Sequence, residues 1–180
     1  TWYGFSKRSR VIAVSKSLKD SNEITRFEDL TDTNWSGKIC SRPGSHVYNR
    51  ALLSSIIAAN GNEAAFAWAK GLVDNFARSP RGNDRSQIKA IFSGECAIAL
   101  VNHYYYGKLI NSEDPAHRKW AESVNIIIPN QGPTDRGAHI NISGGGIAKH
   151  AKHLKEAKQF MEFLVSREAQ ELYASINYEY

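Results

Sequence analysis

The sequence has few cysteines, and this scarcity limits the metal sites that it can form. Cys40 and Cys96 are the two cysteines among the 180 residues, and they lie far apart in the chain. A four-cysteine zinc site is therefore excluded. Each cysteine lies in or beside a short predicted strand, at 38–40 and 97–101, so adjacency of these strands would bring the sulfur atoms within bonding reach. Two buried free thiols are the alternative that the residues alone leave open.

Long apolar runs are also missing. A helix that crosses a bilayer needs roughly 20 apolar residues, and runs such as Ile126-Ile127-Ile128 are far shorter. A membrane-spanning chain is therefore not expected. The opening residues have neither the charged nor the apolar region of an export signal, which an exported protein would have lost. Because both ends of the sequence resemble the middle of a domain, we expect the chain to be a fragment.

Blocks of a single charge are absent as well. The 23 Lys and Arg residues exceed the 18 Asp and Glu residues, which gives a net charge of +5. This balance favours anionic partners. The positive residues are dispersed, however, and the densest group lies at 7–10. Nucleic acid is therefore not an expected partner.

The residues that are present predict an α/β fold. With 42% hydrophobic content, the 180 residues are enough for one hydrophobic core but too few for two ordinary domains. The expected strands are 10–15, 38–40, 97–101, 125–129 and 138–142. The expected helices are 46–59, 63–75, 85–92, 103–111 and 115–123, with a helical tail from Leu154. We expect Ser45 to cap the helix 46–59 and residues 143–146 to form a flexible joint. This alternation places ligand-binding groups at the carboxyl ends of strands and on the helix starts that follow.

Four tyrosines lie at such positions. Tyr104, Tyr105 and Tyr106 directly follow the strand 97–101, and three consecutive residues cannot all face a core. A turn from strand to helix would place Tyr104 and Tyr105 over the strand end. Tyr48 lies one turn into its helix, where exposed backbone N–H groups also favour an anion. Ordinary packing with a hydrogen-bonded hydroxyl is the alternative for each of them.

The phenol is a ligand for a hard cation. Fe(III) prefers anionic oxygen donors, which phenolates, carboxylates and small oxyanions provide. A phenol has an ordinary pKa near 10, so it ionises at neutral pH only beside a strong positive charge. Metal uptake by tyrosines must therefore release protons and weaken in acid.

Two enzyme patterns are alternatives to this interpretation. Tyr104 and Lys108 have the spacing of the Tyr and Lys pair of short-chain dehydrogenases, but no glycine-rich dinucleotide turn follows the opening strand. A catalytic α/β domain that uses His46 or His139 as a base is the second pattern. A receptor for an organic or oxyanion solute without metal is a further alternative.

Several segments resemble the periplasmic ferric-iron-binding proteins of the multi-tyrosine class. They are GKICSR (37–42), SHVYN (45–49), RGNDRSQIKAI (81–91), GEC (94–96) and NHYYYGK (102–108). The resemblance continues through IPNQ (128–131), GAHINISG (137–144) and EFLVS (162–166), so it covers nearly the whole chain.

The resemblance implies a periplasmic-binding-protein type II fold with two lobes that close on Fe(III). Such a receptor is not an enzyme; it works in the periplasm and delivers its iron to an inner-membrane ABC permease. The implied iron ligands are Tyr48, Tyr104 and Tyr105, with Tyr106 outside the coordination shell. A synergistic anion such as carbonate is also implied, and its expected partners are Arg10 (in preference to Arg8), Ser45 and Asn102.

The same resemblance implies a division of the chain. Residues 1–9 would enter the hinge, 10–123 would form the ligand-binding α/β lobe, 124–149 would be hinge-crossing strands of the partner lobe, and 150–180 would be C-terminal helices. The N-terminal part of the first lobe, with its His and Tyr ligand motif, has no counterpart here. Exposed strand edges would then favour association. In an oxidising periplasm the resemblance also favours a disulfide between Cys40 and Cys96.

Overall fold

The computed structural model describes residues 2–179, which divide into two compact units. The larger unit is Ser9–His139, and the smaller one combines Thr1–Arg8 with Ile140–Tyr180. Strand β1 (Trp2–Ser15) contributes residues to both units. Within the described residues, no helix has the length and apolar character that a bilayer crossing requires.

The sheet of the larger unit has the strand order β2-β3-β1-β4. Its other strands are β2 (Ile39–Cys40), β3 (Ile98–Asn102) and β4 (Val124–Ile127). Strand β1 runs antiparallel to both β3 and β4, while β2 and β3 are parallel. Arg10 of β1 lies opposite Asn102 of β3, so the register places Arg10 at the strand end that precedes the tyrosines.

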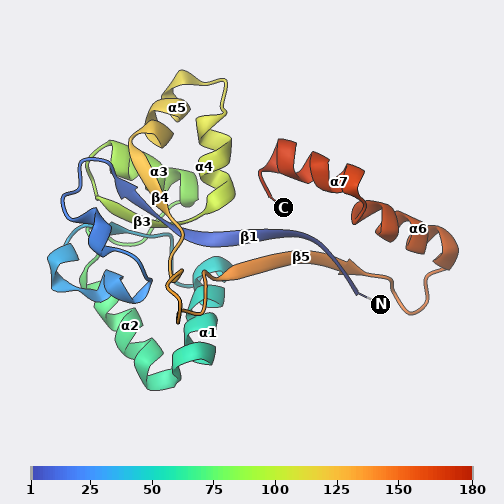
Figure 1. The fold of residues 1–180 in the computed structure, drawn as a ribbon, viewed down its shortest axis with the longest axis horizontal. Coiled ribbons are helices and arrows are strands. Elements are labelled where there is room, and N and C mark those ends of the chain that lie inside the picture. Colours follow the sequence, from blue (N-terminus) through green and yellow to red (C-terminus); the bar gives the residue numbers. More distant parts are fainter. Residues whose placement is uncertain (1, 180) are drawn as a thin grey trace. The chain divides into compact units, whose positions relative to one another are not determined.

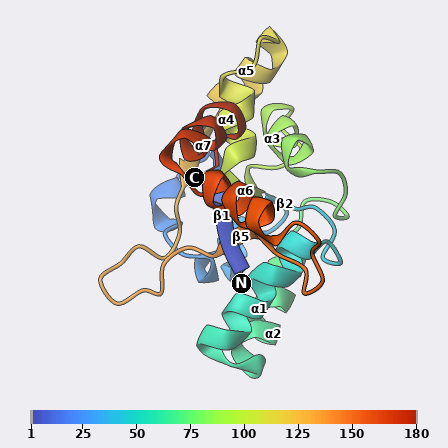
Figure 2. The same ribbon diagram turned by 90° about the vertical axis from the view of Figure 1, so that its right-hand side faces the viewer.

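Two helical layers cover this sheet. The first contains α1 (Val47–Asn60) and α2 (Asn62–Asp74), which lie side by side in Figure 2. The second contains α3 (Asp84–Phe92), α4 (His103–Ile110) and α5 (Pro115–Glu122). Short 3-10 turns at Ser21–Glu23, Glu28–Thr31 and Thr33–Trp35 connect β1 to β2. The predicted α/β class is confirmed, and the helices start and end close to the predicted residues.

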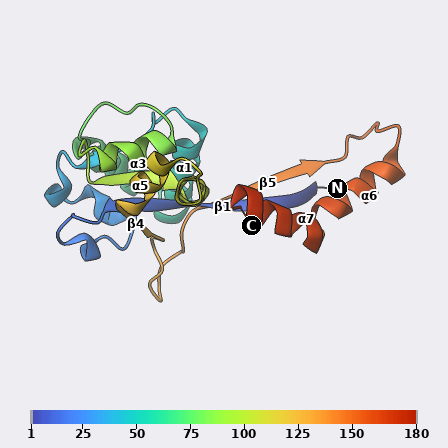
Figure 3. The same cartoon turned by 90° about the horizontal axis from the view of Figure 1, so that it is seen from above.

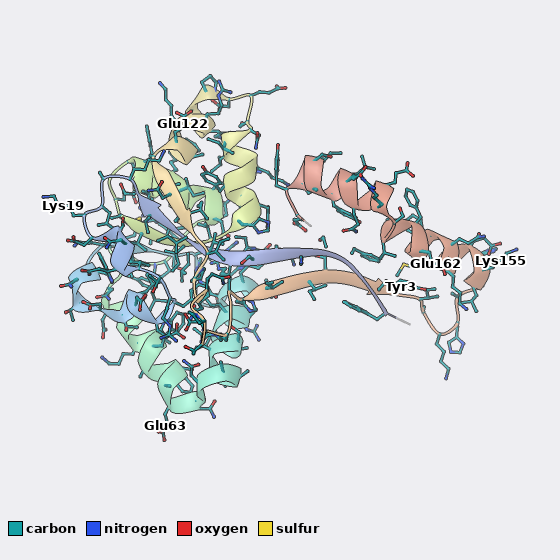
Figure 4. All side chains as sticks on the ribbon, viewed as in Figure 1. Tyr3, Lys19, Glu63, Glu122, Lys155 and Glu162 are labelled. Carbon is teal, nitrogen blue, oxygen red and sulfur yellow. A yellow bond between two sulfur atoms is a disulfide. The ribbon has the colours of Figure 1, made fainter. Side chains whose placement is uncertain are left out.

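The core is divided by the sheet because successive strand residues point to opposite faces. Ile12 and Val14 belong to one buried cluster, which also contains Trp68 of α2. Val11 and Ala13 belong to a second cluster with residues of α3, α4 and α5. In contrast, long charged side chains such as Lys19, Glu63 and Glu122 extend outward from the same unit in Figure 4 and are exposed.

The predicted disulfide is confirmed. Cys40 of β2 and Cys96, two residues before β3, are bonded, with their Cα atoms 5.9 Å apart. The parallel pairing of these two strands brings the cysteines together, and both are buried in the second cluster.

The smaller unit contains β5 (Ile140–Gly146), which pairs with β1 (Figure 3). It also contains α6 (Leu154–Leu164), α7 (Arg167–Leu172) and a π-helical turn at Tyr173–Asn177 (Figure 1). The boundaries between the units thus fall after residue 8 and after residue 139. The assignment of 124–149 to a partner lobe and the other predicted boundaries stay predictions.

The prediction of a flexible joint at residues 143–146 was wrong. These residues end strand β5. Glycine is required there for close packing rather than for mobility, since a Cβ atom on Gly144 would overlap the Trp2 ring and the Tyr3 carbonyl oxygen. The same pairing explains why β1 begins at Trp2 instead of residue 10.

Candidate metal site

Tyr48 lies in the first turn of α1. Residue His46 caps this helix, and its Nδ1 accepts a hydrogen bond from the Tyr48 N–H at 3.2 Å. The prediction of Ser45 as the cap was therefore wrong, because the helix begins one residue later than expected. Burial, and then the charge of Arg42, lower the pKa of His46. The imidazole is thus kept in the neutral form whose Nδ1 can accept this bond.

Tyr104 and Tyr105 lie in the first turn of α4, directly after Asn102 ends β3. Tyr104 is 8% exposed and Tyr105 is half-buried. Their rings stack with centroids 4.3 Å apart and an interplanar angle of 29°. Tyr106 instead packs against the second buried cluster. The rings of Tyr104 and Tyr105 therefore lie together, while the partly buried ring of Tyr106 packs elsewhere.

The fold brings the predicted tyrosines together. The hydroxyl oxygens of Tyr48 and Tyr104 are 3.2 Å apart although the residues are separated by 56 positions. Tyr105 joins this pair through its stacking on Tyr104. Oxygen donors from α1 and α4 thus meet at one place, next to the carboxyl end of β3.

Tyr104 is neutral in the absence of a cation. Burial raises its pKa, and hydrogen bonds with Tyr105 and Tyr48 raise it further. Each of these contacts favours the protonated phenol over the phenolate. A ligand that requires phenolate must therefore displace a proton from this side chain.

Positive charges surround the three rings. The guanidinium carbon of Arg42 lies 4.9 Å from the centroid of the Tyr48 ring, and that of Arg10 lies 5.9 Å from it. Lys108 lies 5.6 Å from the Tyr104 ring, and Arg85 lies 5.9 Å from the Tyr105 ring. Cations at such distances interact favourably with aromatic faces. They also favour an anionic phenolate or a bound oxyanion.

A buried ionic cluster lies beside Tyr48, and sequence analysis missed it. Asp84 is fully buried and accepts hydrogen bonds from Arg10 at 2.8 Å and from Arg42 at 3.0 Å. It also accepts one from the Asn102 N–H at 2.8 Å. In the sequence Asp84 could be taken for a helix cap, but Asn83 performs that role by accepting from the Ser86 N–H.

The predicted anion-binding residues have different surroundings. Arg10 is 1% exposed, and its Nη atoms donate to Asp84, Asn102 and Asn49. Burial lowers the pKa of Arg10, while Asp84 opposes this change. Asn102 is also 1% exposed, and Ser45 is exposed. Anion binding by these residues stays a prediction.

Three further basic residues are His103, His139 and Arg8. The Nδ1 atom of His103 accepts a hydrogen bond from the Ser9 N–H at 3.0 Å, which orients its ring on the β1 backbone. His139 accepts the Arg10 N–H through its carbonyl oxygen at 2.9 Å. Burial, followed by Arg10 and Arg136, lowers the pKa of His139. Arg8 belongs to the smaller unit and donates to Ser143 there.

Comparisons with known proteins indicate the family of the chain. Residues 1–180 match the family of bacterial extracellular solute-binding proteins. The chain is 47% identical to iron uptake protein A1 of Synechocystis sp. over 179 residues, which are 99% of this chain and 49% of that protein. It is 27% identical to the major ferric iron-binding protein of Neisseria meningitidis, over 99% of this chain and 52% of that protein. The chain thus spans about half the length of the curated relatives it matches.

Solved structures show the same fold. A Trichodesmium protein in complex with iron and citrate ligands superposes with a TM-score of 0.94 at 45% identity, covering 99% of this chain and 56% of that one. The ferric binding protein from Campylobacter jejuni superposes with a TM-score of 0.91 at 42% identity, covering 99% and 56%.

Proposed function

The chain belongs to the family of bacterial extracellular solute-binding proteins, and we propose that it binds ferric iron through Tyr48, Tyr104 and Tyr105. The observation that carries this proposal is the 3.2 Å separation of the Tyr48 and Tyr104 hydroxyl oxygens, with Tyr105 stacked on Tyr104. Three potential phenolates at one place suit a hard trivalent cation. Iron is the cargo of such a protein, which acts as a binding protein and not as an enzyme.

The chemistry of iron binding depends on whether the phenols are protonated. Burial keeps Tyr104 protonated in the empty protein by raising its pKa. Fe(III) supplies the positive charge that makes phenolate the stable form, so protons leave as the metal enters. The lysine and arginine side chains around the rings favour the same ionised state. Three tyrosines leave coordination positions for other groups.

An oxyanion fills part of the remaining coordination in this proposal. The Trichodesmium structure contains citrate together with iron. In this chain the Nδ2 atom of Asn102 is buried and has no hydrogen-bond partner within residues 2–179. It is available to a carbonate or carboxylate beside the α4 start, where backbone N–H groups also favour an anion. Ser45 and Arg10 are the further candidates.

The place of this binding step is the periplasm, and the receiving partner is an inner-membrane ABC permease. A relative from Serratia marcescens, 27% identical over 181 residues, is an Fe(3+)-binding periplasmic protein. The disulfide between Cys40 and Cys96 is compatible with an oxidising compartment of this kind.

A titration with ferric citrate tests the proposal. Phenolate bound to Fe(III) produces a charge-transfer band in the visible region, so we expect the concentrated protein to become coloured. Replacing Tyr48, Tyr104 or Tyr105 by Phe should weaken the band in each case. Tyr106→Phe is the matched control, because this neighbouring ring packs against the second buried cluster and should leave the band intact.

A colourless protein at saturating ferric citrate would refute the iron site. Thermal stabilisation by an organic or oxyanion solute in the same colourless sample would instead indicate a receptor for that solute.

A further inference from the structure

The ionic cluster beside Tyr48 is unusual because it is buried and unbalanced in charge. Arg10 and Asp84 have fully buried side chains, and the side chain of Arg42 is 10% exposed. Two guanidinium groups share one carboxylate, so the cluster has a net charge of +1. Burying such groups carries a large desolvation penalty, and replacement by apolar residues is often neutral or stabilising. Stability alone therefore does not account for this cluster.

Asp84 connects the two segments that carry the tyrosines. One of its oxygens, Oδ2, accepts from the Asn102 N–H at 2.8 Å, two residues before Tyr104. The same oxygen accepts from Arg10 Nη1 at 2.8 Å. Arg10 Nη2 donates in turn to Asn49 Oδ1 at 2.7 Å, and Asn49 directly follows Tyr48. A single carboxylate thus bridges the start of α4 and the start of α1.

The second oxygen of Asp84 holds Arg42 against the Tyr48 ring. Arg42 Nη1 donates to Asp84 Oδ1 at 3.0 Å, while the guanidinium carbon lies 4.9 Å from the ring centroid. The main chain of Arg42 is fixed as well, because its carbonyl oxygen accepts from Asn49 Nδ2 at 2.9 Å. The cation is therefore held at a defined place on the face of a phenol.

We propose that Asp84 is a positioning residue of the tyrosine site: it fixes Tyr48 relative to Tyr104 and holds Arg42 on the face of the Tyr48 ring. The identity of the bound cation in this inference rests on the proposed function. Asp84 itself need not touch the metal. Groups that orient the ligands of a metal typically change its affinity by 10–100-fold when they are replaced.

The first test is Asp84→Asn in the full chain, titrated with ferric citrate. We expect iron affinity to fall by about 10–100-fold. The charge-transfer band should move to longer wavelength, because Arg42 leaves the ring and the Tyr48 phenolate becomes a better electron donor. If Arg42 instead stayed on the ring and only the negative charge of Asp84 were lost, the band would move to shorter wavelength. Asp74→Asn is the matched control, since Asp74 is an exposed residue paired with Lys70.

Arg42→Gln provides a second variant if Asp84→Asn does not fold. It leaves the buried pair of Arg10 and Asp84 neutral, so the fold should persist. We expect the same shift to longer wavelength, with Arg50→Gln on the exposed side of α1 as the control. The double variant Asp84→Asn with Arg42→Gln has the wild-type net charge of the cluster. Its affinity should remain low, because positioning and not net charge is lost.

Three outcomes would overturn the proposal: wild-type affinity in Asp84→Asn, a band that moves to shorter wavelength, or full recovery in the double variant. If the wild-type protein itself stays colourless, the proposed function fails, and the positioning role is decided without metal. Fluorotyrosine-labelled protein then shows whether Asp84→Asn moves the ¹⁹F signals of Tyr48 and Tyr104 and leaves that of Tyr173 unchanged. Movement supports positioning of a site for another ligand, and unchanged signals refute it.

Discussion

The two units differ in how completely they enclose their apolar side chains. Both buried clusters lie entirely within Ser9–His139. In the smaller unit, Met161 and Ala169 are the apolar residues that reach burial among those described, while Phe160 and Ile176 are at least 60% exposed. The unit that carries the tyrosines is therefore stabilised by its own core, and the other is not.

This difference matters for the site. Metal ligands need to be held within a fraction of an ångström of their bound positions, and packed strands and helices hold them better than loops do. Tyr104 follows a fully buried strand, and Tyr48 begins a helix whose Leu52 and Ile56 are buried. The geometry of the tyrosines should thus be independent of events in the smaller unit.

The largest expected effect is loss of the disulfide. Replacing Cys40 and Cys96 by Ala opens a loop with a sequence separation of 56, which should lower the free energy of unfolding by about 4 kcal/mol in the chain-entropy description. Urea unfolding followed by tryptophan fluorescence measures this loss. Hydrogen exchange in α6 serves as the internal control, because that helix belongs to the smaller unit. Equal destabilisation of both units would show that they share one cooperative core.

The next largest loss of stability is expected from shortening a buried side chain. Leu100→Ala in β3 removes a side chain that is 1% exposed and should cost about 3 kcal/mol. The matched change in the smaller unit is Phe160→Ala, which removes a larger side chain that is 60% exposed. It should change the free energy of unfolding by less than about 0.5 kcal/mol. A larger loss for Phe160→Ala than for Leu100→Ala, measured by urea unfolding, would contradict the contrast between the units.

A third, smaller effect concerns association. The exposed apolar residues of α6 should drive self-association, and Phe160→Glu with Phe163→Glu should weaken it about tenfold, or about 1.4 kcal/mol. Light scattering over a range of concentrations measures the change. Phe66→Glu on α2 is the control, because Phe66 belongs to the larger unit and is similarly exposed, at 66%. A wild-type protein that stays monomeric at every concentration would refute this expectation.

The same contrast explains which features the sequence could predict. Helices and strands of the larger unit follow from apolar periodicity, because each has a buried face that selects apolar residues. Position after a strand indicated Tyr104 and Tyr105, whereas the grouping of Tyr48 with them was predicted mainly from the family resemblance. Their contact depends on strand order, which no local pattern specifies.

Other features depend on long-range pairing and were missed or wrong. Asp84 has no local sign of burial, because its partners Arg10 and Arg42 lie 74 and 42 positions away. Gly144 suggested mobility, since a glycine in a close strand pairing and a glycine in a flexible joint look identical in sequence. The length of β1 could not be predicted either, because its first residues pair with the distant strand β5.

The smallest expected effect is the pH dependence of the empty protein, and it belongs to the larger unit alone. The pKa of Tyr104 is raised above its unfolded value, mainly by burial. Its contribution to stability is therefore complete below the unfolded pKa near 10 and is lost as the pH rises beyond it. Urea unfolding between pH 8 and pH 11 should show a steeper decline for the wild type than for Tyr104→Phe.

The proposed binding of iron at the same side chain has the opposite pH dependence: iron affinity should rise with pH, whereas the stability of the empty protein falls. The empty protein favours the protonated phenol, whereas the proposed iron complex requires phenolate, so each proton that leaves on loading should make the affinity rise with pH. Ferric titrations at pH 5.5 and 7.5 should therefore show tighter binding at the higher pH, and Tyr104→Phe should reduce the difference. An affinity that does not change with pH would mean that the phenols stay protonated when iron binds. If the affinity does rise with pH, the burial that favours the protonated Tyr104 in the empty protein also favours release of the iron in acid.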